Sequence, residues 1–150
     1  MGKSTEMLIY EMSLRVRLFR MFMGSENNPG NLTDREILIL ELLSMKDSMS
    51  ISEIGALCPT VSGSTISTTI TKLWKENKLV NKQILPENQR VTAVSLTDEG
   101  MRAIKEIKRT KSELYSTIAE SLELSPEEDV LFQNILANAI VFFDKKLNLR

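Results

Sequence analysis

The sequence contains no histidine, and its 150 residues include a single cysteine, Cys58. Histidine is the commonest side-chain ligand of zinc, nickel and copper and a frequent base in hydrolases, so its absence argues against a transition-metal sensor and a histidine-dependent hydrolase. One cysteine cannot form an intramolecular disulfide. We therefore predict a protein that is not an enzyme and that holds no metal and no other cofactor.

Long apolar segments are also missing. No uninterrupted apolar run approaches the ~20 residues that a membrane-spanning helix needs. The first residues of the chain lack the layout of a signal peptide, because Glu6 and Glu11 interrupt their apolar side chains. We expect a cytoplasmic protein without a membrane partner.

The chain has no excess of positive charge either, since 19 basic residues face 20 acidic ones and the formal net charge is -1. Proteins whose surface is adapted to nucleic acid over a large area are usually basic. Any binding of DNA must therefore depend on a local concentration of charge. The hydrophobic content of 42% is nevertheless enough for a folded core in one domain-sized chain.

Helix start signals recur along the sequence. A Ser or Thr followed three residues later by Glu has the spacing of a capping box, and it occurs at Thr33–Glu36, Ser50–Glu53 and Ser125–Glu128. Apolar periodicity continues beyond each box. These patterns predict helices that end at about Met45, Leu57 and Lys146.

The two ends of the chain are strongly apolar. Residues 5–23 place two adjacent apolar rows on a predicted helix, and residues 126–146 place apolar side chains around most of the circumference. A monomer with a small helical core has little volume to enclose such helices. We predict that residues 1–24 and 101–150 pack together and against a second copy, forming a homodimer. The candidate dimerisation residues are Leu8, Met12, Val130, Ile135, Ile140, Phe142 and Phe143.

The sequence from Ser62 or Ser64 to about Asn77 predicts a helix with one apolar side and one polar side. Ser62 or Ser64 is expected to cap its start, and Asn77 is expected to adopt the left-handed conformation at its end. The polar side is rich in hydroxyl groups and lysines. The apolar seam consists of Ile66, Ile70, Leu73 and Trp74.

A short β ribbon is predicted to follow this helix. Residues 79–85 and 91–96 read as two strands, separated by the turn-forming residues 86–90. After the ribbon, Thr97 caps a long helix of somewhat over 30 Å, at about 1.5 Å per residue. A narrow apolar stripe runs along it, formed by Met101, Ile104, Ile107, Leu114, Ile118 and Leu122.

Positive charge gathers in the helix and ribbon. Residues 59–96 contain five basic and two acidic side chains, a local net charge of plus three. A helix with a polar face beside a ribbon with a basic tip is suited to entering one DNA groove and touching its neighbour. The competing interpretation is an ordinary solvated surface. Exposed threonines are poor helix formers, and their presence at Thr68, Thr69 and Thr71 favours a ligand.

This order of elements resembles the MarR family of winged helix-turn-helix regulators. Residues 64–73, STISTTITKL, are similar to the recognition helix of that family, and residues 94–100, VSLTDEG, are similar to the segment after its wing. Three features differ from the family pattern. Asn88 stands where an aspartate often precedes the wing arginine, Lys78 stands where glycine is usual, and the 73–80 link is one residue longer.

The resemblance implies a mainly α fold with a small two-stranded wing, a DNA-binding part at residues 32–100 and terminal helices that dimerise. It also implies transcription regulation through a pseudo-palindromic site in double-stranded DNA, with two recognition helices about 34 Å apart. Repression and release by a small-molecule effector are common in the family. The DNA-binding residues that we expect are Ser62, Ser64, Thr65, Ser67, Thr68, Thr71, Lys72, Lys75, Lys82 and Arg90.

Two alternatives stay open. A winged helix can act as a protein-interaction adaptor that does not read DNA, and exposed aromatic residues on the recognition helix would favour that role. Cys58 could sense oxidants, as cysteines of some MarR proteins do, or it could be a small packing residue. We favour the DNA-binding regulator and the packing cysteine.

Overall fold

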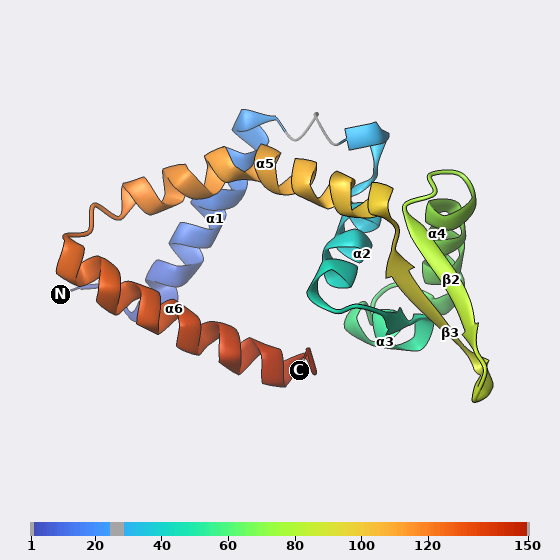
Figure 1. Cartoon of the computed structure of the whole chain (residues 1–150). Coiled ribbons are helices and arrows are strands. Elements are labelled where there is room, and N and C mark those ends of the chain that lie inside the picture. The colour runs from blue at the N-terminus through green and yellow to red at the C-terminus, as the bar shows by residue number, and fades with distance from the viewer. Residues whose placement is uncertain (1, 25–28, 150) are drawn as a thin grey trace. The chain divides into compact units, whose positions relative to one another are not determined.

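The computed structural model describes residues 2–24 and 29–149 (Figure 1), and these fall into two compact units that divide between Ser112 and Glu113. Helix α5 begins in the first unit and ends in the second. The elements are α1 (Thr5–Met23), a 3-10 turn (Pro29–Asn31), α2 (Asp34–Met45), β1 (Met49–Ser50), α3 (Ile51–Leu57), α4 (Gly63–Lys75), β2 (Val80–Leu85), β3 (Asn88–Leu96), α5 (Asp98–Ser121) and α6 (Pro126–Lys146).

All three predicted capping boxes are present. The Thr33 hydroxyl accepts a hydrogen bond from the Glu36 amide, and the Glu36 carboxylate accepts one from the Thr33 amide. The boxes at Ser50–Glu53 and Ser125–Glu128 have the same reciprocal bonds. Each box satisfies backbone donors that a helix start would otherwise leave unpaired. The predicted ends of α2, α3 and α6 are confirmed.

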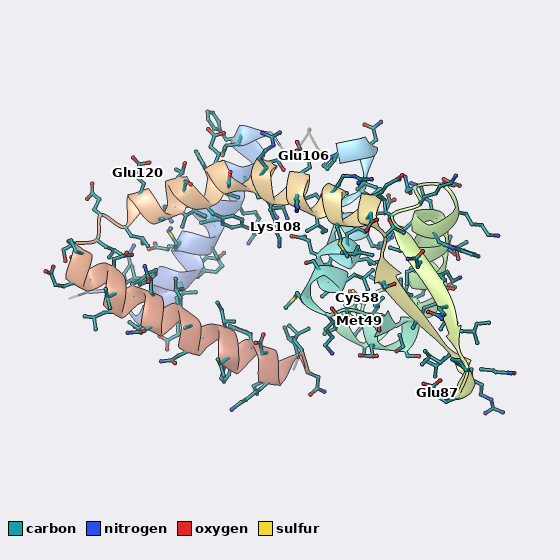
Figure 2. All side chains as sticks on the ribbon, viewed as in Figure 1. Met49, Cys58, Glu87, Glu106, Lys108 and Glu120 are labelled. Carbon is teal, nitrogen blue, oxygen red and sulfur yellow. The ribbon has the colours of Figure 1, made fainter. Side chains whose placement is uncertain are left out.

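The core of the first unit lies between α2, α3, α4 and the sheet, and the first part of α5 joins it. Ile39, Leu40 and Ile54 are fully buried in this core. Met49 and Cys58, both labelled in Figure 2, belong to the same cluster. The prediction that Cys58 packs in the interior agrees with this position.

The sheet has three antiparallel strands in the order β1-β3-β2, so the predicted two-stranded ribbon was incomplete. The third strand, β1, pairs Met49 with Val94 and Ser50 with Ala93. Two residues are too short for an alternating pattern, and Ser50 also caps α3. This short strand fastens the base of the ribbon to the helical core.

The ribbon, or wing, turns more tightly than the sequence predicted. β3 begins at Asn88 rather than Val91, so only Pro86 and Glu87 separate the strands. Leu85 pairs with Asn88 while Ile84 pairs with Thr92, and a bulge in β3 therefore accommodates residues 89–91. The predicted turn at 86–90 was wrong because the bulge interrupts the alternating pattern by which a strand is recognised, so residues 88–90 resemble a turn.

The terminal helices begin and end as predicted but bury little. α1 has no buried residue, and Phe22 is 85% exposed. Along α6 the buried residue is Asp144, while most apolar side chains are about half exposed. In α5, Ile104, Ile107 and Leu114 are buried, but Met101 is 53% exposed and departs from its predicted stripe. Within residues 2–24 and 29–149, no helix is long and apolar enough to cross a membrane.

Candidate nucleic-acid interface

Helix α4 starts in a cluster of hydroxyl groups. Ser62 is the N-cap, because its hydroxyl accepts a hydrogen bond of 3.2 Å from the Thr65 amide. The same Ser62 oxygen lies 3.2 Å from the Ser64 hydroxyl and 2.8 Å from the Thr65 hydroxyl. Of the two predicted caps, Ser62 is therefore the correct one. The cluster leaves Ser64 exposed in the first turn.

The inner side of α4 is formed by Ile66, Ile70 and Leu73, which are fully buried. Trp74, predicted as part of this seam, is 39% exposed instead. The residues of the seam follow the spacing i, i+4, i+7, and each further residue turns about 100° around the helix. Trp74 therefore lies to one side of the seam rather than on it.

The outer side of α4 is a row formed by Ser64, Thr68, Thr71 and Lys75, which we call the outward row. Its spacing of four, three and four residues places it opposite the buried seam. Ser64, Thr68 and Lys75 are exposed, and Thr71 is half-buried beside the wing. Four of the ten predicted DNA-binding residues thus share one accessible face.

The threonines of α4 also have partners inside the helix. The Thr68 hydroxyl donates to the Ser64 carbonyl at 2.8 Å, and the Thr69 hydroxyl donates to the Thr65 carbonyl at 2.7 Å. Threonine hydroxyls within a helix commonly donate to the carbonyl four residues earlier. The poor helix propensity of threonine is therefore no longer a separate sign of a ligand, although Thr68 itself is exposed.

One flank of α4 faces α2. The Lys72 Nζ lies 3.3 Å from the Glu36 Oε1, and the Glu36 residue is 2% exposed. Burial alone would raise the pKa of the Glu36 carboxyl, but hydrogen bonds from Thr33 and Lys72 outweigh burial and lower the pKa. Sequence patterns do not reveal this partner, because Lys72 and Glu36 lie 36 positions apart in the chain.

The other flank of α4 faces β2, which lies beside it (Figure 1). The Lys82 Nζ lies 3.4 Å from the Thr71 hydroxyl and 5.0 Å from the centre of the Trp74 ring. The Lys75 Nζ is 5.5 Å from the same ring. Cations at these distances are attracted to the face of an indole. Trp74 therefore holds two lysines at the junction of helix and wing, and half-buried Ser67 lies on this side of the helix.

The end of α4 differs from its prediction. Lys78, not Asn77, has the left-handed conformation, with φ of 56°. The last turn widens, because the Asn77 amide reaches back to the Lys72 carbonyl at 3.2 Å and the Leu79 amide reaches the Leu73 carbonyl at 2.9 Å. This wider turn absorbs the additional residue between Leu73 and Val80.

Thr97 and Gly100 join the start of α5 to this junction. The Thr97 hydroxyl donates to the Lys78 carbonyl at 2.8 Å and accepts from the Gly100 amide at 3.0 Å, and the Thr97 amide donates to the Leu79 carbonyl. A Cβ atom at Gly100 would lie 2.1 Å from the Leu79 oxygen. Glycine is therefore required where the two segments of backbone meet.

Arg90 lies near the far end of the wing and is exposed. Its amide donates to the Asn88 side-chain oxygen at 3.1 Å, so Asn88 forms a local turn where MarR proteins often have an aspartate. Glu87 lies at the tip of the wing (Figure 2) and adds one negative charge there. The wing thus presents a cation whose backbone is held by Asn88.

The predicted dimerisation residues are all exposed in the single chain. Leu8 of α1 is 53% exposed and Met12 is 37% exposed. In α6 the exposed fractions are 59% for Val130, 62% for Ile135, 59% for Ile140, 55% for Phe142 and 58% for Phe143. Exposed apolar surface of this kind is typical of an interaction surface.

Residues 32–100 match the sequence model of a family described as the winged helix DNA-binding domain. Apo wild-type MarR from E. coli has the same fold, with a TM-score of 0.67 at 15% identity over 93% of this chain and 98% of that chain. A MepR mutant from a multidrug-resistant S. aureus clinical isolate has a TM-score of 0.68 at 18% identity, over 95% of this chain and 99% of that chain.

BpsR from Bordetella bronchiseptica, whose DNA binding is described as regulated by 6-hydroxynicotinic acid, gives a TM-score of 0.55 at 21% identity, over 91% of this chain and 93% of that chain. No curated protein matches the chain in sequence. Residues 32–100 are therefore similar to winged helix DNA-binding domains, and the chain has the fold of the MarR regulators, so the predicted resemblance and fold class are confirmed.

Proposed function

We propose that this protein is a homodimeric transcriptional regulator that binds a specific DNA sequence and acts as a repressor. The observation that supports this proposal best is the outward row of α4. Ser64, Thr68 and Lys75 are exposed on the side opposite a fully buried seam, within a domain of the winged helix DNA-binding family. A helix presented in this way can enter a major groove, which is about 12 Å wide.

The outward row offers the chemistry that base and phosphate recognition needs. Hydroxyl groups of Ser64 and Thr68 can bond base edges or phosphates, and the threonine methyl can contact the methyl group of thymine. Lys75 supplies a phosphate contact at the end of the row. Lys82, held against Trp74, adds positive charge beside it.

The wing is proposed to contact DNA next to the groove that α4 enters. Arg90 is exposed, and a guanidinium is attracted to a narrow minor groove or to phosphates. Glu87 at the tip opposes this attraction, so the wing contact is expected to depend on where Arg90 points. We predict that Arg90→Ala weakens DNA binding and leaves the fold intact, because the Asn88 bond uses the backbone of residue 90.

A salt titration tests the contribution of Arg90. The slope of log affinity against log salt should become shallower by about 0.9 for each phosphate that the variant no longer neutralises. Glu87→Gln, which removes the opposing charge at the same tip, is the matched variant and should strengthen binding. An Arg90→Ala protein with the wild-type affinity at every salt concentration would remove Arg90 from the proposed interface.

Dimerisation is proposed to occur through α1 and α6. These helices expose apolar side chains that a solvated surface does not favour, and a two-fold dimer would present two α4 helices about 34 Å apart. The DNA site is then a short pseudo-palindrome. A protein that is monomeric at micromolar concentration would contradict this part of the proposal.

We also propose that a small-molecule effector releases the protein from DNA. BpsR, which shares the fold, is described as regulated by 6-hydroxynicotinic acid. Oxidation of Cys58 is the less suitable control, since its thiol is buried and belongs to the core cluster. Screening small aromatic acids for the release of bound DNA tests this proposal.

One observation favours the adaptor as a second candidate. Trp74 is an exposed aromatic residue on α4, and exposed aromatic residues are typical of protein-interaction surfaces. The two lysines beside its ring are better suited to an anionic partner, and DNA is such a partner. Because Trp74 is the single tryptophan of the chain, its fluorescence reports directly on this surface.

The deciding experiment is a gel shift with the DNA upstream of the protein's own gene, at two salt concentrations, together with Trp74 fluorescence. We expect salt-sensitive retardation that resists competitor DNA, and a change in Trp74 emission at the same protein concentrations. A duplex selected from a random-sequence library provides the second probe. Absence of retardation for both probes at every salt concentration would support the adaptor.

A further inference from the structure

Lys72 has an anionic partner within its own chain. Its Nζ lies 3.3 Å from the Glu36 Oε1, while the Lys72 side chain as a whole is 44% exposed and that of Glu36 is 3% exposed. The pair therefore consists of a buried carboxylate and a lysine that covers it from the solvent side. Lys72 differs in this respect from Lys75, which lies one turn further along α4 over the Trp74 ring.

The buried carboxylate depends on Lys72. Glu36 accepts a bond of 3.1 Å from the Thr33 amide on Oε1, and its Oε2 has no hydrogen-bond partner within residues 2–24 and 29–149. A buried charge that is left incompletely bonded needs an opposite charge nearby. Lys72 supplies that charge, so withdrawing Lys72 toward a phosphate would leave the carboxylate uncompensated.

The Lys72–Glu36 pair also connects α4 to α2. Glu36 stands in the first turn of α2, inside the capping box, and Lys72 stands near the end of α4. The ion pair therefore joins the start of one helix to the end of the other. At about 100° per residue, Lys72 and Lys75 point in directions roughly 60° apart, with Lys72 turned toward α2 and Lys75 in the outward row.

We propose that Lys72 is a positioning residue that fixes α4 on α2 through Glu36, and that Lys75 rather than Lys72 contacts the DNA phosphates. This inference assigns a residue of the recognition helix to the support of the helix rather than to the reading of DNA. The claim about DNA contacts, which we call the DNA half, rests on the function proposed above. The claim that Lys72 fixes α4 on α2, which we call the structural half, does not depend on DNA binding.

The structural half is tested by a double-mutant cycle of Glu36→Gln, Lys72→Met and the double variant in urea unfolding. Glutamine still completes a capping box and methionine keeps most of the lysine stem, so the variants should fold. We expect Lys72→Met to lower the folding equilibrium constant about tenfold or more, because it leaves a buried charge unpaired. The double variant should lose no more than Lys72→Met alone.

The DNA half is tested by the salt dependence of binding to the duplex selected from a random-sequence library. We expect Lys75→Met to lower the slope by about 0.9 for each phosphate that it no longer neutralises, whereas Lys72→Met lowers affinity without this change in slope. Glu36→Gln should likewise leave the slope unchanged. Lys75→Met is the matched control, since it removes the same charge from the same helix.

The unfolding cycle and the salt titration can each contradict the inference on its own. Additive effects in the unfolding cycle, or a loss of slope in Lys72→Met equal to that in Lys75→Met, would overturn the inference. A steeper slope in Glu36→Gln would overturn it too, because it would show that a released Lys72 reaches phosphate. If the wild-type protein binds no duplex, the proposed function fails, and the unfolding cycle alone decides whether Lys72 positions α4.

Discussion

Helices α2 and α6 begin with the same capping motif, but the apolar side chains of α2 are largely buried and those of α6 are largely exposed. Both start with a complete capping box, and α6 has in addition a proline in its first turn. Yet the 12 residues of α2 bury Ile37, Ile39, Leu40 and Leu43, whereas the 21 residues of α6 bury Asp144 and leave most of their apolar side chains half exposed. Local signals determine where a helix starts, but they contain no information about what covers it.

The same contrast separates the winged part from the terminal helices as a whole. Residues of α2, α3, α4 and the sheet find their partners inside the chain, including the buried charge of Glu36. α1 and α6 are as apolar but have no comparable cover within the described residues. A second copy is the economical source of that cover, and this is the physical basis of the proposed dimer.

The largest expected effect comes from breaking the apolar surface of α6. Ile135→Glu combined with Phe143→Glu should convert the protein to a monomer at micromolar concentration, because two charges would be buried at the interface. DNA affinity should fall by about 10²- to 10⁴-fold, since two linked recognition helices become one. Sedimentation and the gel shift measure the two results. Truncation before Val130 should have the same outcome.

Met45→Glu is the matched control for this experiment. Met45 is 56% exposed, about as much as Ile135 and Phe143, but it lies at the end of α2. A charge there should change neither the dimer nor DNA affinity. Equal losses of dimerisation and DNA affinity from Met45→Glu and from the α6 variant would show that exposed apolar residues in the two regions are equivalent. The proposed role of α6 as a specific dimer surface would then be contradicted.

A second test concerns backbone contact inside the winged part. Gly100→Ala should lower the free energy of unfolding by about 1 to 3 kcal/mol, because the new Cβ would overlap the Leu79 oxygen and the junction would have to shift. Gly55→Ala in α3 meets no such atom and should raise stability by roughly 0.5 to 1 kcal/mol. Urea unfolding measures both. Equal effects of the two substitutions would contradict the close contact at Gly100.

Much of this architecture could be predicted, because its signals are local. The capping boxes located α2, α3 and α6, and the seam of Ile66, Ile70 and Leu73 located the inner side of α4. The strand β1 could not be found, since two residues have no periodicity and their pairing with β3 is a tertiary event. The bulge that draws Asn88 into β3 was missed for a similar reason.

The candidate site was predictable in composition but not in arrangement. Sequence patterns identified the hydroxyl groups and cations of α4 and the wing, and the DNA contacts of these residues stay a prediction. They could not show that Lys72 pairs with Glu36 or that Trp74 lies outside the seam beside Lys82. Those contacts join residues from different elements, and no spacing within one element encodes them.

The caps themselves provide a smaller test of the two regions. Thr33→Ala and Ser125→Ala each remove a hydroxyl that accepts an amide hydrogen bond, and each should cost about 1 kcal/mol of unfolding free energy. Because both variants keep the apolar surfaces of α1 and α6, the unfolding midpoints of the wild type and of both variants should rise with protein concentration in parallel if the protein unfolds from a dimer. A midpoint that stays constant with concentration in all three proteins would contradict the proposed dimer.

The smallest expected effect is in the acid range and distinguishes the capping-box glutamates of the two regions. Hydrogen bonds from Ser125 lower the pKa of Glu128, and for Glu36 the bonds from Thr33 and Lys72 lower the pKa despite the opposing influence of burial. Ionised glutamate therefore contributes stability above its unfolded pKa of about 4.3, and the contribution is lost as pH falls through the lower folded value. Glu36→Gln should flatten the fall in unfolding free energy between about pH 5 and pH 3 more than Glu128→Gln does, since the Glu36 carboxylate is buried whereas solvent screens the exposed Glu128 carboxylate. Equal flattening by the two substitutions would mean that burial adds nothing to the Glu36 interaction, and the contrast between the covered and uncovered helices would then be one of apolar surface alone.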